Sequence, residues 1–323
     1  MTVKNANYIN RISQDTSRGP SAAIWGDCPW EDMVQNDGGG IGNVGYRFVD
    51  DFNMTGQPAL NAASSMGQWA CWADTSSTLT DAGEGGGVLK VLNTSNPKQI
   101  VLSSNAGGFR MVSGATGFPL QQKLWFEARV AVSSITTGVR DLFVGLCDNT
   151  TTQICSANNL VVGTAGNVLI TTPNLFGFHF RDTTNPTDVG LAFNVASGTV
   201  QYPTALQTLS LTVAGAALTA YAAVTNGNGT GFVKLGFVFD PEAGNVPITI
   251  STASSGQTVG TVAKPLVKVY VNGQQCATFL TSTNVQASTF PTGRMAPCLA
   301  FGTQTNSAYA MYDWIRVAQL GSF

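Results

Sequence analysis

The most constraining stretch of the chain is residues 264–280, where two strand-like runs flank a two-residue turn. The turn is Asn272-Gly273. Both residues readily adopt the positive φ angles of a type I′ turn, so the runs are predicted to form a tight antiparallel hairpin with Cys276 opposite Val269. The first strand is apolar on both faces: Val267, Val269 and Val271 lie on one face of the hairpin, and Leu266, Tyr270 and, from the second strand, Phe279 lie on the other. Such a hairpin is predicted to be an inner strand pair of a layered β structure, covered on both sides.

Further strand-like runs follow one another from Tyr46 onward, separated by turn signals, in the rhythm of a β-sandwich. In residues 123–133 one face is predicted to be core, and the other, with Trp125, Glu127 and Arg129, to be at least partly polar. Residues 205–224 fit a helix or a strand, and their surroundings favour a strand. The other predicted strands are 46–52, 68–72, 88–93, 99–103, 108–112, 141–147, 167–171, 174–182, 189–195, 231–240, 246–251, 298–303 and 308–319.

The composition is unusually poor in charge. Only 11% of the 323 residues are charged, against roughly a quarter in an average soluble domain. The surface must therefore consist mainly of Ser, Thr, Asn, Gln and Gly. With a mean hydropathy of +0.10, some apolar surface is expected to meet another protein, which favours an assembly.

Several classes of protein are disfavoured by the same composition. The 16 basic and 18 acidic residues give a net charge of −2 without basic runs, so no nucleic-acid partner is expected. No run of about 18 apolar residues predicts a membrane span, and the N-terminus lacks the apolar core of a signal peptide. The chain is therefore expected to fold in a cytoplasm. Its six cysteines lack a CxxC motif and it has one histidine, His179, so free thiols are expected and a zinc site is not.

The first 45 residues differ from the rest, because they mix polar residues with isolated aromatics and lack strand alternation. They end in a glycine-rich run, residues 38–42, that is typical of a flexible hinge. We interpret residues 1–45 as an N-terminal arm and residues 46–323 as the sandwich. The candidate partner-binding residues are Tyr8, Trp25 and Trp30. The two tryptophans either pack on their own domain or reach a neighbouring subunit.

The strand pattern of residues 46–320 resembles the concanavalin A-like (laminin-G-like) jelly roll of lectins, family-16 glucanases and many bacteriophage virion proteins. FVDDF (48–52) and YDWIRV (312–317) resemble the first and last strands of that fold, which usually lie near each other. Four further runs resemble the successive inner strands of phage structural proteins of this type. They are LWFEARV (124–130), DLFVGLCD (141–148), LGFVFD (235–240) and VKVYVNG (267–273). The resemblance implies an all-β, concanavalin A-like jelly-roll sandwich and leaves the function open.

The candidate chemistry is sparse. A family-16 glucanase needs clustered carboxylates, whereas the four glutamates, at 31, 84, 127 and 242, are far apart in sequence, so no catalytic residue is assigned. Glu127 is predicted to pair with Arg129, and His179 to be a surface or groove residue. The possible calcium ligands also fit ordinary turns, and neither a metal nor another cofactor is assigned. They are Asp148-Asn149, Asp182, Asp188 and Asp240-Pro241-Glu242. Trp72 and Trp125 are candidate glycan-stacking residues, with core packing as the alternative.

These observations favour a non-enzymatic virion structural protein of a bacteriophage, a capsid decoration (cement) protein on the capsid surface. It is expected to bind the major capsid protein and to form a homo-oligomer, a trimer being one option. One alternative is a glycan-binding, lectin-like module of a tail fibre or spike. Another is a polysaccharide-degrading enzyme without the glucanase carboxylate pattern.

Overall fold

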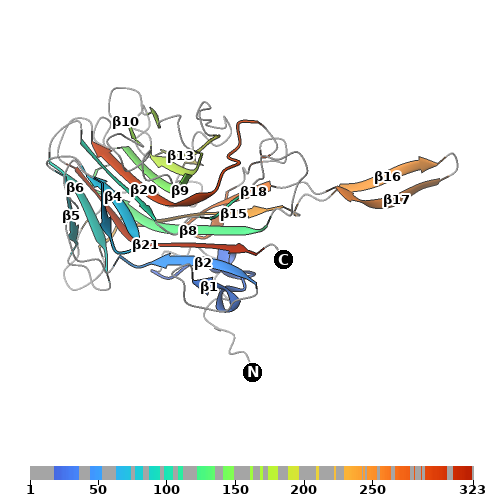
Figure 1. The fold of residues 1–323 in the computed structure, drawn as a ribbon, viewed down its shortest axis with the longest axis horizontal. Coiled ribbons are helices and arrows are strands. Elements are labelled where there is room, and N and C mark those ends of the chain that lie inside the picture. Colours follow the sequence, from blue (N-terminus) through green and yellow to red (C-terminus); the bar gives the residue numbers. More distant parts are fainter. Residues whose placement is uncertain are drawn as a thin grey trace.

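The computed structural model shows two β-sheets that face each other in a sandwich (Figure 1). The two helices it describes are single turns, α1 (Ala22–Trp25) and η2 (Trp30–Asp32), so no described helix has the length and apolarity to cross a membrane. The structure describes residues 18–35, 44–52, 63–73, 77–82, 87–94, 98–104, 108–111, 122–134, 141–148, 161–162, 168–169, 174–180, 188–195, 209–210, 222, 229–241, 243, 246–252, 255–262, 266–276, 280, 285, 288–303 and 308–321. Tyr8 lies outside them.

The large sheet has nine strands, and its β1–β2 pair is parallel while its other pairs are antiparallel. Its main path is β1 (Val34–Gln35), β2 (Gly45–Asp50), β21 (Ala308–Leu320), β8 (Leu124–Val132), β15 (Val233–Asp240), β18 (Leu266–Val271) and β19 (Gln274–Gln275). The strands β5 (Ser77–Asp81) and β6 (Leu89–Asn93) extend from β21. Because β2 pairs with β21, the predicted proximity of the first and last strands of the sandwich is confirmed.

The small sheet has eight antiparallel strands. Its order is β14 (Leu209–Ser210), β13 (Asp188–Asn194), β12 (Leu175–Phe180), β9 (Asp141–Asp148), β20 (Met295–Thr303), β7 (Lys98–Ser104), β4 (Trp69–Ala73) and β3 (Ala63–Met66). Two separate pairs complete the described strands: β10 (Val161–Val162) with β11 (Val168–Leu169), and β16 (Val246–Thr252) with β17 (Ser255–Val262). In the ambiguous segment 205–224, Leu209 and Ser210 form β14 and Ala222 bridges to Thr230. The predicted all-β sandwich is confirmed.

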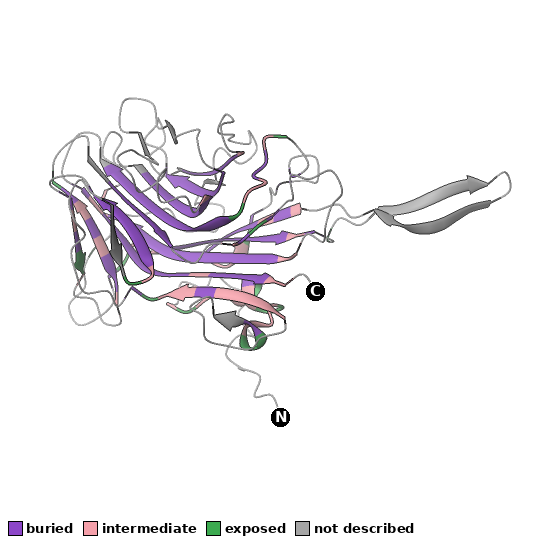
Figure 2. Cartoon of the chain, in the orientation of Figure 1, coloured by how far each residue is buried: buried purple, intermediate pink, exposed green. Residues whose placement is uncertain are grey.

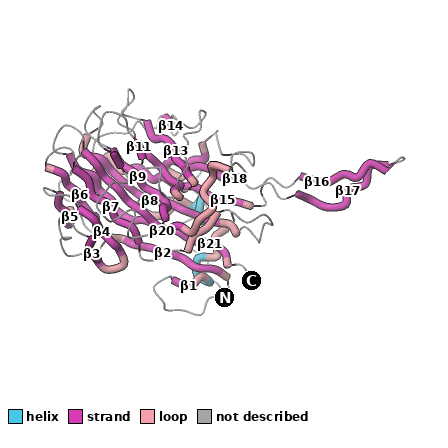
Figure 3. The backbone as a smooth tube through the Cα atoms, turned by 45° about the horizontal axis from the view of Figure 1, so that its top comes forward, coloured by secondary structure: helices cyan, strands magenta, loops and turns pink. Residues whose placement is uncertain are grey.

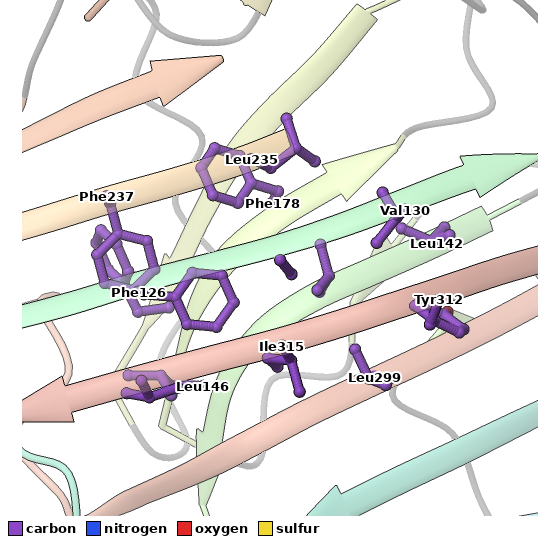
Figure 4. Packing of buried hydrophobic residues seen from close by; sticks show 14 of the residues in the cluster. Phe126, Val130, Leu142, Leu146, Phe178, Leu235, Phe237, Leu299, Tyr312 and Ile315 are labelled. Atoms are coloured by element: carbon purple, nitrogen blue, oxygen red, sulfur yellow. The ribbon is translucent and has the colours of Figure 1, made fainter. Parts of the chain in front are cut away.

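The core fills the space between the two sheets with alternate residues of each strand (Figure 4). Phe126 of β8 stacks on Phe237 of β15 with ring centres 4.7 Å apart, and Phe176 of β12 meets Phe237 edge to face, also at 4.7 Å. Such aromatic pairs contribute about 0.5–1.5 kcal/mol beyond the burial of their area. The predicted core face of residues 174–182 is confirmed by the burial of Phe176, Phe178 and Phe180.

The outer faces of the sheets are also largely buried (Figure 2). Every residue of β4, β8 and β12 is buried, including those that face away from the core. His179 is one of them, so its predicted place at the surface or in a groove is wrong. The alternation of β12 identifies its core face but contains no information about what covers the opposite face.

The hairpin that includes β18 and β19 forms as predicted, but its place in the sheet differs. Asn272 and Gly273 have φ angles of 48° and 75°, as a type I′ turn requires, and the Cys276 amide donates to the Val269 carbonyl. Both faces of β18 are covered, one by the core and the other by the cluster that contains Tyr270. The prediction of an inner strand pair is wrong for β19, which ends the sheet. Both residues of β19 pair with β18, and Leu280 bridges to Val267, so the second arm of the hairpin lies along an edge of the large sheet.

Candidate functional site

The outer face of the large sheet is covered by residues 18–35, which we call the N-terminal strap (Figure 1). The strap includes α1, η2 and β1, and it lies on the side of the sheet that faces away from the small sheet. An apolar cluster joins the strap to the sheet, with Ile24 and Met33 from the strap and Trp125, Val238, Tyr270 and Ala318 from the strands. Because the predicted polar face of β8 points into this contact, its residues are buried.

A glycine in β15 makes room for the strap. A Cβ atom placed on Gly236 would lie 2.3 Å from Cδ1 of Ile24 and 2.9 Å from the Phe126 carbonyl oxygen. Both distances are shorter than real Cβ contacts. The missing side chain of Gly236 therefore creates the space in which Ile24 is buried, and the surface of the sheet is shaped to fit the strap.

The beginning of the strap is held by a buried carboxylate. Nε of Arg18 donates to the two carboxylate oxygens of Asp313 at 2.9 and 3.0 Å, and Arg129 of β8 also forms an ion pair with Asp313. Nζ of Lys234 donates to the Gly19 carbonyl at 3.0 Å, and the indole N–H of Trp314 donates to the Arg18 carbonyl at 2.6 Å. Charge-assisted bonds to planar carboxylates are among the stronger hydrogen bonds in proteins.

A β-bulge explains why Asp313 points toward the strap. Tyr312 and Trp314 lie opposite Val130 and Arg129 of β8, so Asp313 is the extra residue between them. Tyr312 belongs to the core, whereas Asp313 and Trp314 both reach the strap. A bulge redirects side chains in this way and permits two consecutive outward residues.

Glu127 binds the middle of the strap. Its Oε2 accepts hydrogen bonds from the Ser21 amide at 2.9 Å and from the Trp25 indole at 2.7 Å. Burial raises the pKa of Glu127, and these bonds, together with the charge of Lys234, oppose that rise. Its Oε1 is buried without a hydrogen-bond partner. Glu127 was predicted to pair with Arg129. In the structure Arg129 forms an ion pair with Asp313, and the Glu127 carboxylate fastens the strap through two N–H donors.

The end of the strap is held by Asp27 and Trp30. The Asp27 carboxylate accepts from the Trp125 indole at 2.9 Å and from Nζ of Lys123 at 2.5 Å. Burial raises the pKa of Asp27, but the bonds from Lys123 and Trp125 outweigh burial and the net shift is downward. The Arg47 guanidinium donates to the Trp30 carbonyl at 2.5 Å and lies 5.0 Å from the ring centre, within cation–π range.

The candidate partner-binding and glycan-binding residues of the sequence lie in different places in the structure. Trp25 and Trp30 contact each other edge to face, with ring centres 5.1 Å apart, and both lie against their own chain. Trp125 is 1% exposed beneath the strap, so no sugar can stack on its ring while the strap is in place. Trp72 is 6% exposed and belongs to a cluster on the outer face of the small sheet. The two candidate glycan residues therefore lie on opposite sides of the sandwich and form no common site.

The candidate metal ligand Asp148 and the cysteines have contacts that are typical of structural residues. Asp148 accepts hydrogen bonds from Asn174, and the Asn174 side chain accepts hydrogen bonds from the Thr292 and Gly293 amides. These bonds connect the end of β9 to the segment that precedes β20. Among the described residues, no group of three or more His, Cys, Asp or Glu is placed to hold a metal ion. The described cysteines, Cys28, Cys71, Cys147, Cys276 and Cys298, are free thiols, as predicted for them.

A second feature outside the sandwich is the pair β16–β17, which we call the ribbon. Its strands pair antiparallel from Val246↔Val262 to Thr252↔Ser255, and the ribbon extends away from both sheets (Figures 1 and 3). In the described part of the chain β16 and β17 pair only with each other. The sequence pattern predicts a strand at 246–251 but not its partner. The signal that could have revealed the partner is weak, because Gly256 and Gly260 have low strand propensity.

No protein-family model matches the chain, and no curated protein matches it either. Among solved structures, peanut lectin is similar over 86% of this chain and 98% of its own, with 14% identity and a TM-score of 0.46. A protein of unknown function from Shewanella oneidensis MR-1 is similar over 91% and 92%, with 12% identity and a TM-score of 0.43. A β-glucanase from Bacillus licheniformis is similar over 84% and 97%, with 11% identity and a TM-score of 0.40. All three likenesses have TM-scores below 0.5 and identities below 15%, so they say nothing about the function of this chain.

Proposed function

We propose that the protein is a non-enzymatic structural protein of a bacteriophage virion, a decoration protein that binds the major capsid protein on the head surface. The observation that carries this proposal is the ribbon, which leaves the sandwich and pairs with no other described strand. An isolated two-stranded ribbon is marginally stable in water. A protein that makes such an element can stabilise it by contact with a second molecule, as an assembly protein does.

The well-packed sandwich also supports the decoration role, because it can serve as a rigid body on the head surface. Its core is continuous between the sheets, and the strap adds a second buried layer on the large sheet. Only 11% of the residues are charged, so the surface offers little to repel a closely packed neighbour. Large interfaces with little charge are typical of permanent assemblies.

Immunogold electron microscopy of particles from cells that carry the gene would test the proposal, with antibodies raised against the purified chain. Dense labelling over particle heads is the expected result. Labelling restricted to tails or fibres, or particles without label, would overturn the decoration role.

A glycan array distinguishes the lectin-like alternative. Binding that is lost in Trp72→Ala would favour a sugar site on the outer face of the small sheet. Trp125→Ala is the matched comparison, because Trp125 lies beneath the strap on the other sheet. If the intact chain binds no glycan, the lectin-like alternative loses its support.

A further inference from the structure

Neither edge of the ribbon pairs with another strand in the described part of the chain, and the two edges differ in their capacity to accept one. β16 contains Pro247, which lacks an amide hydrogen, and proline on an edge strand hinders further pairing. β17 has no proline and no charged residue along Ser255–Val262. A bulge beside Thr249 leaves Val259 without a partner in β16, which increases the twist but adds neither proline nor charge to the edge. The edge of β17 is therefore the more open one.

The composition of the ribbon suits an identical partner. No Asp, Glu, Lys or Arg occurs between Glu242 and Lys264. Natural edge strands are commonly protected by charges, above all by lysine, because like charges repel when two copies of one strand approach. The ribbon lacks this protection, so two copies of β17 can face each other without repulsion.

We infer that β17 of one copy pairs antiparallel with β17 of a second copy of this chain, so that two ribbons form a four-stranded sheet around a two-fold axis. Antiparallel pairing of one segment with itself is the self-complementary contact of a symmetric dimer. With the axis through Thr258, residues 255–261 of the two copies overlap, and Ser255 of one lies opposite Thr261 of the other. Main-chain hydrogen bonds supply the contact, as in strand addition to a sheet edge. This inference deepens the proposed function and rests on it for the role in assembly.

The experiment measures the mass of the purified full-length chain by light scattering over a wide range of concentrations. A mass of twice 33.7 kDa is expected at high concentration. The variant Thr258→Lys/Val259→Lys places two positive charges at the centre of β17, where they approach the same charges of the second copy. Its mass should fall to that of one chain, and so should the mass of Thr258→Glu/Val259→Glu. When the two variants are mixed, opposite charges should restore the dimer.

The control places the same charges on β5, an edge strand of the large sheet, as Thr78→Lys/Thr80→Lys and Thr78→Glu/Thr80→Glu. These variants should retain the mass of the unmodified chain. The inference is overturned if the chain is monomeric at every concentration, if it is a trimer, or if the β17 variants keep its mass. It is also overturned if the mixture fails to restore the dimer.

The two proposals can fail separately. A ribbon-dependent dimer that is absent from particle heads would refute the decoration role and leave the pairing intact. A protein that labels heads but keeps its mass in the β17 variants would refute the pairing alone.

Discussion

The strap and the ribbon both lie outside the sandwich core, and they are attached to it in opposite ways. The strap is bound along its length by buried side chains of the large sheet, among them Glu127, Lys234 and Asp313. The ribbon shares no strand pairing with either sheet in the described part of the chain. Intrachain contacts thus account for the strap, whereas for the ribbon we propose a contact between molecules.

The difference bears on two alternatives that the sequence leaves open for Trp25 and Trp30, packing on their own domain or reaching a neighbouring subunit. Both tryptophans lie against the sheet of their own chain, while β16 and β17 extend away from the sandwich. Aromatic residues therefore accompany the segment that packs on its own sheet, and uncharged residues accompany the segment for which we propose a contact between molecules.

The largest expected effect is that of Asp313→Asn, which removes the charge that holds Arg18 and Arg129. Asp313 is fully buried, and the loss of one partner from a buried ion pair costs about 3–5 kcal/mol because the other charge remains uncompensated. Chemical denaturation should show a loss of this size in the free energy of unfolding.

The matched control for Asp313→Asn is Glu31→Gln, which removes a carboxylate from the exposed surface of the strap. Its effect should remain within about 0.5 kcal/mol. Equal effects of the two variants would show that the Asp313 ion pairs do not fasten the strap.

Gly236→Ala should have the next largest effect, because its methyl group would meet Ile24 and the Phe126 carbonyl. Overpacking of this kind costs about 1–3 kcal/mol. Ile24→Val removes the Cδ1 atom that lies 2.3 Å from the added methyl group, so the double variant should lose less stability than the sum of the single variants. Purely additive losses in this cycle would mean that Ile24 does not occupy the space beside Gly236.

Glu127→Gln should change the pH dependence of stability. Burial raises the pKa of Glu127, so between about pH 4.3, the pKa of an unfolded glutamate, and its higher folded pKa the folded chain binds more protons. Stability from this group is therefore present at low pH and lost as the pH rises through that window, by at most about 1.4 kcal/mol per pH unit.

Glutamine does not titrate and can still accept the bonds from Ser21 and Trp25. Unfolding free energies measured at several pH values should therefore shift in favour of Glu127→Gln as the pH rises. A constant difference between the two proteins across the window would contradict the raised pKa.

Local alternation explains which parts of this architecture the sequence could predict. The core faces of β8 and β12 follow from residues two apart on one strand, and the turn at Asn272-Gly273 follows from the φ angles that it requires. The strap site depends on Arg18 and Asp313, which are 295 residues apart in the chain. Charged residues in the middle of apolar strands, such as Lys234, were the available signal. A bulge and a glycine, neither recognisable as a binding feature in one sequence, complete the fit.

The smallest expected effect on stability is that of removing the ribbon. Val246 and Val262 are paired, so their Cα atoms lie about 5 Å apart and a short Gly-Ser turn can replace residues 246–262. Because the ribbon pairs with neither sheet, the unfolding free energy at low protein concentration should change by less than about 0.5 kcal/mol. Deletion of residues 1–35 is the matched comparison and should destabilise the chain clearly, since it uncovers the Trp125 cluster. A large loss on ribbon removal would show that the ribbon braces its own sandwich, and the contrast with the strap would disappear.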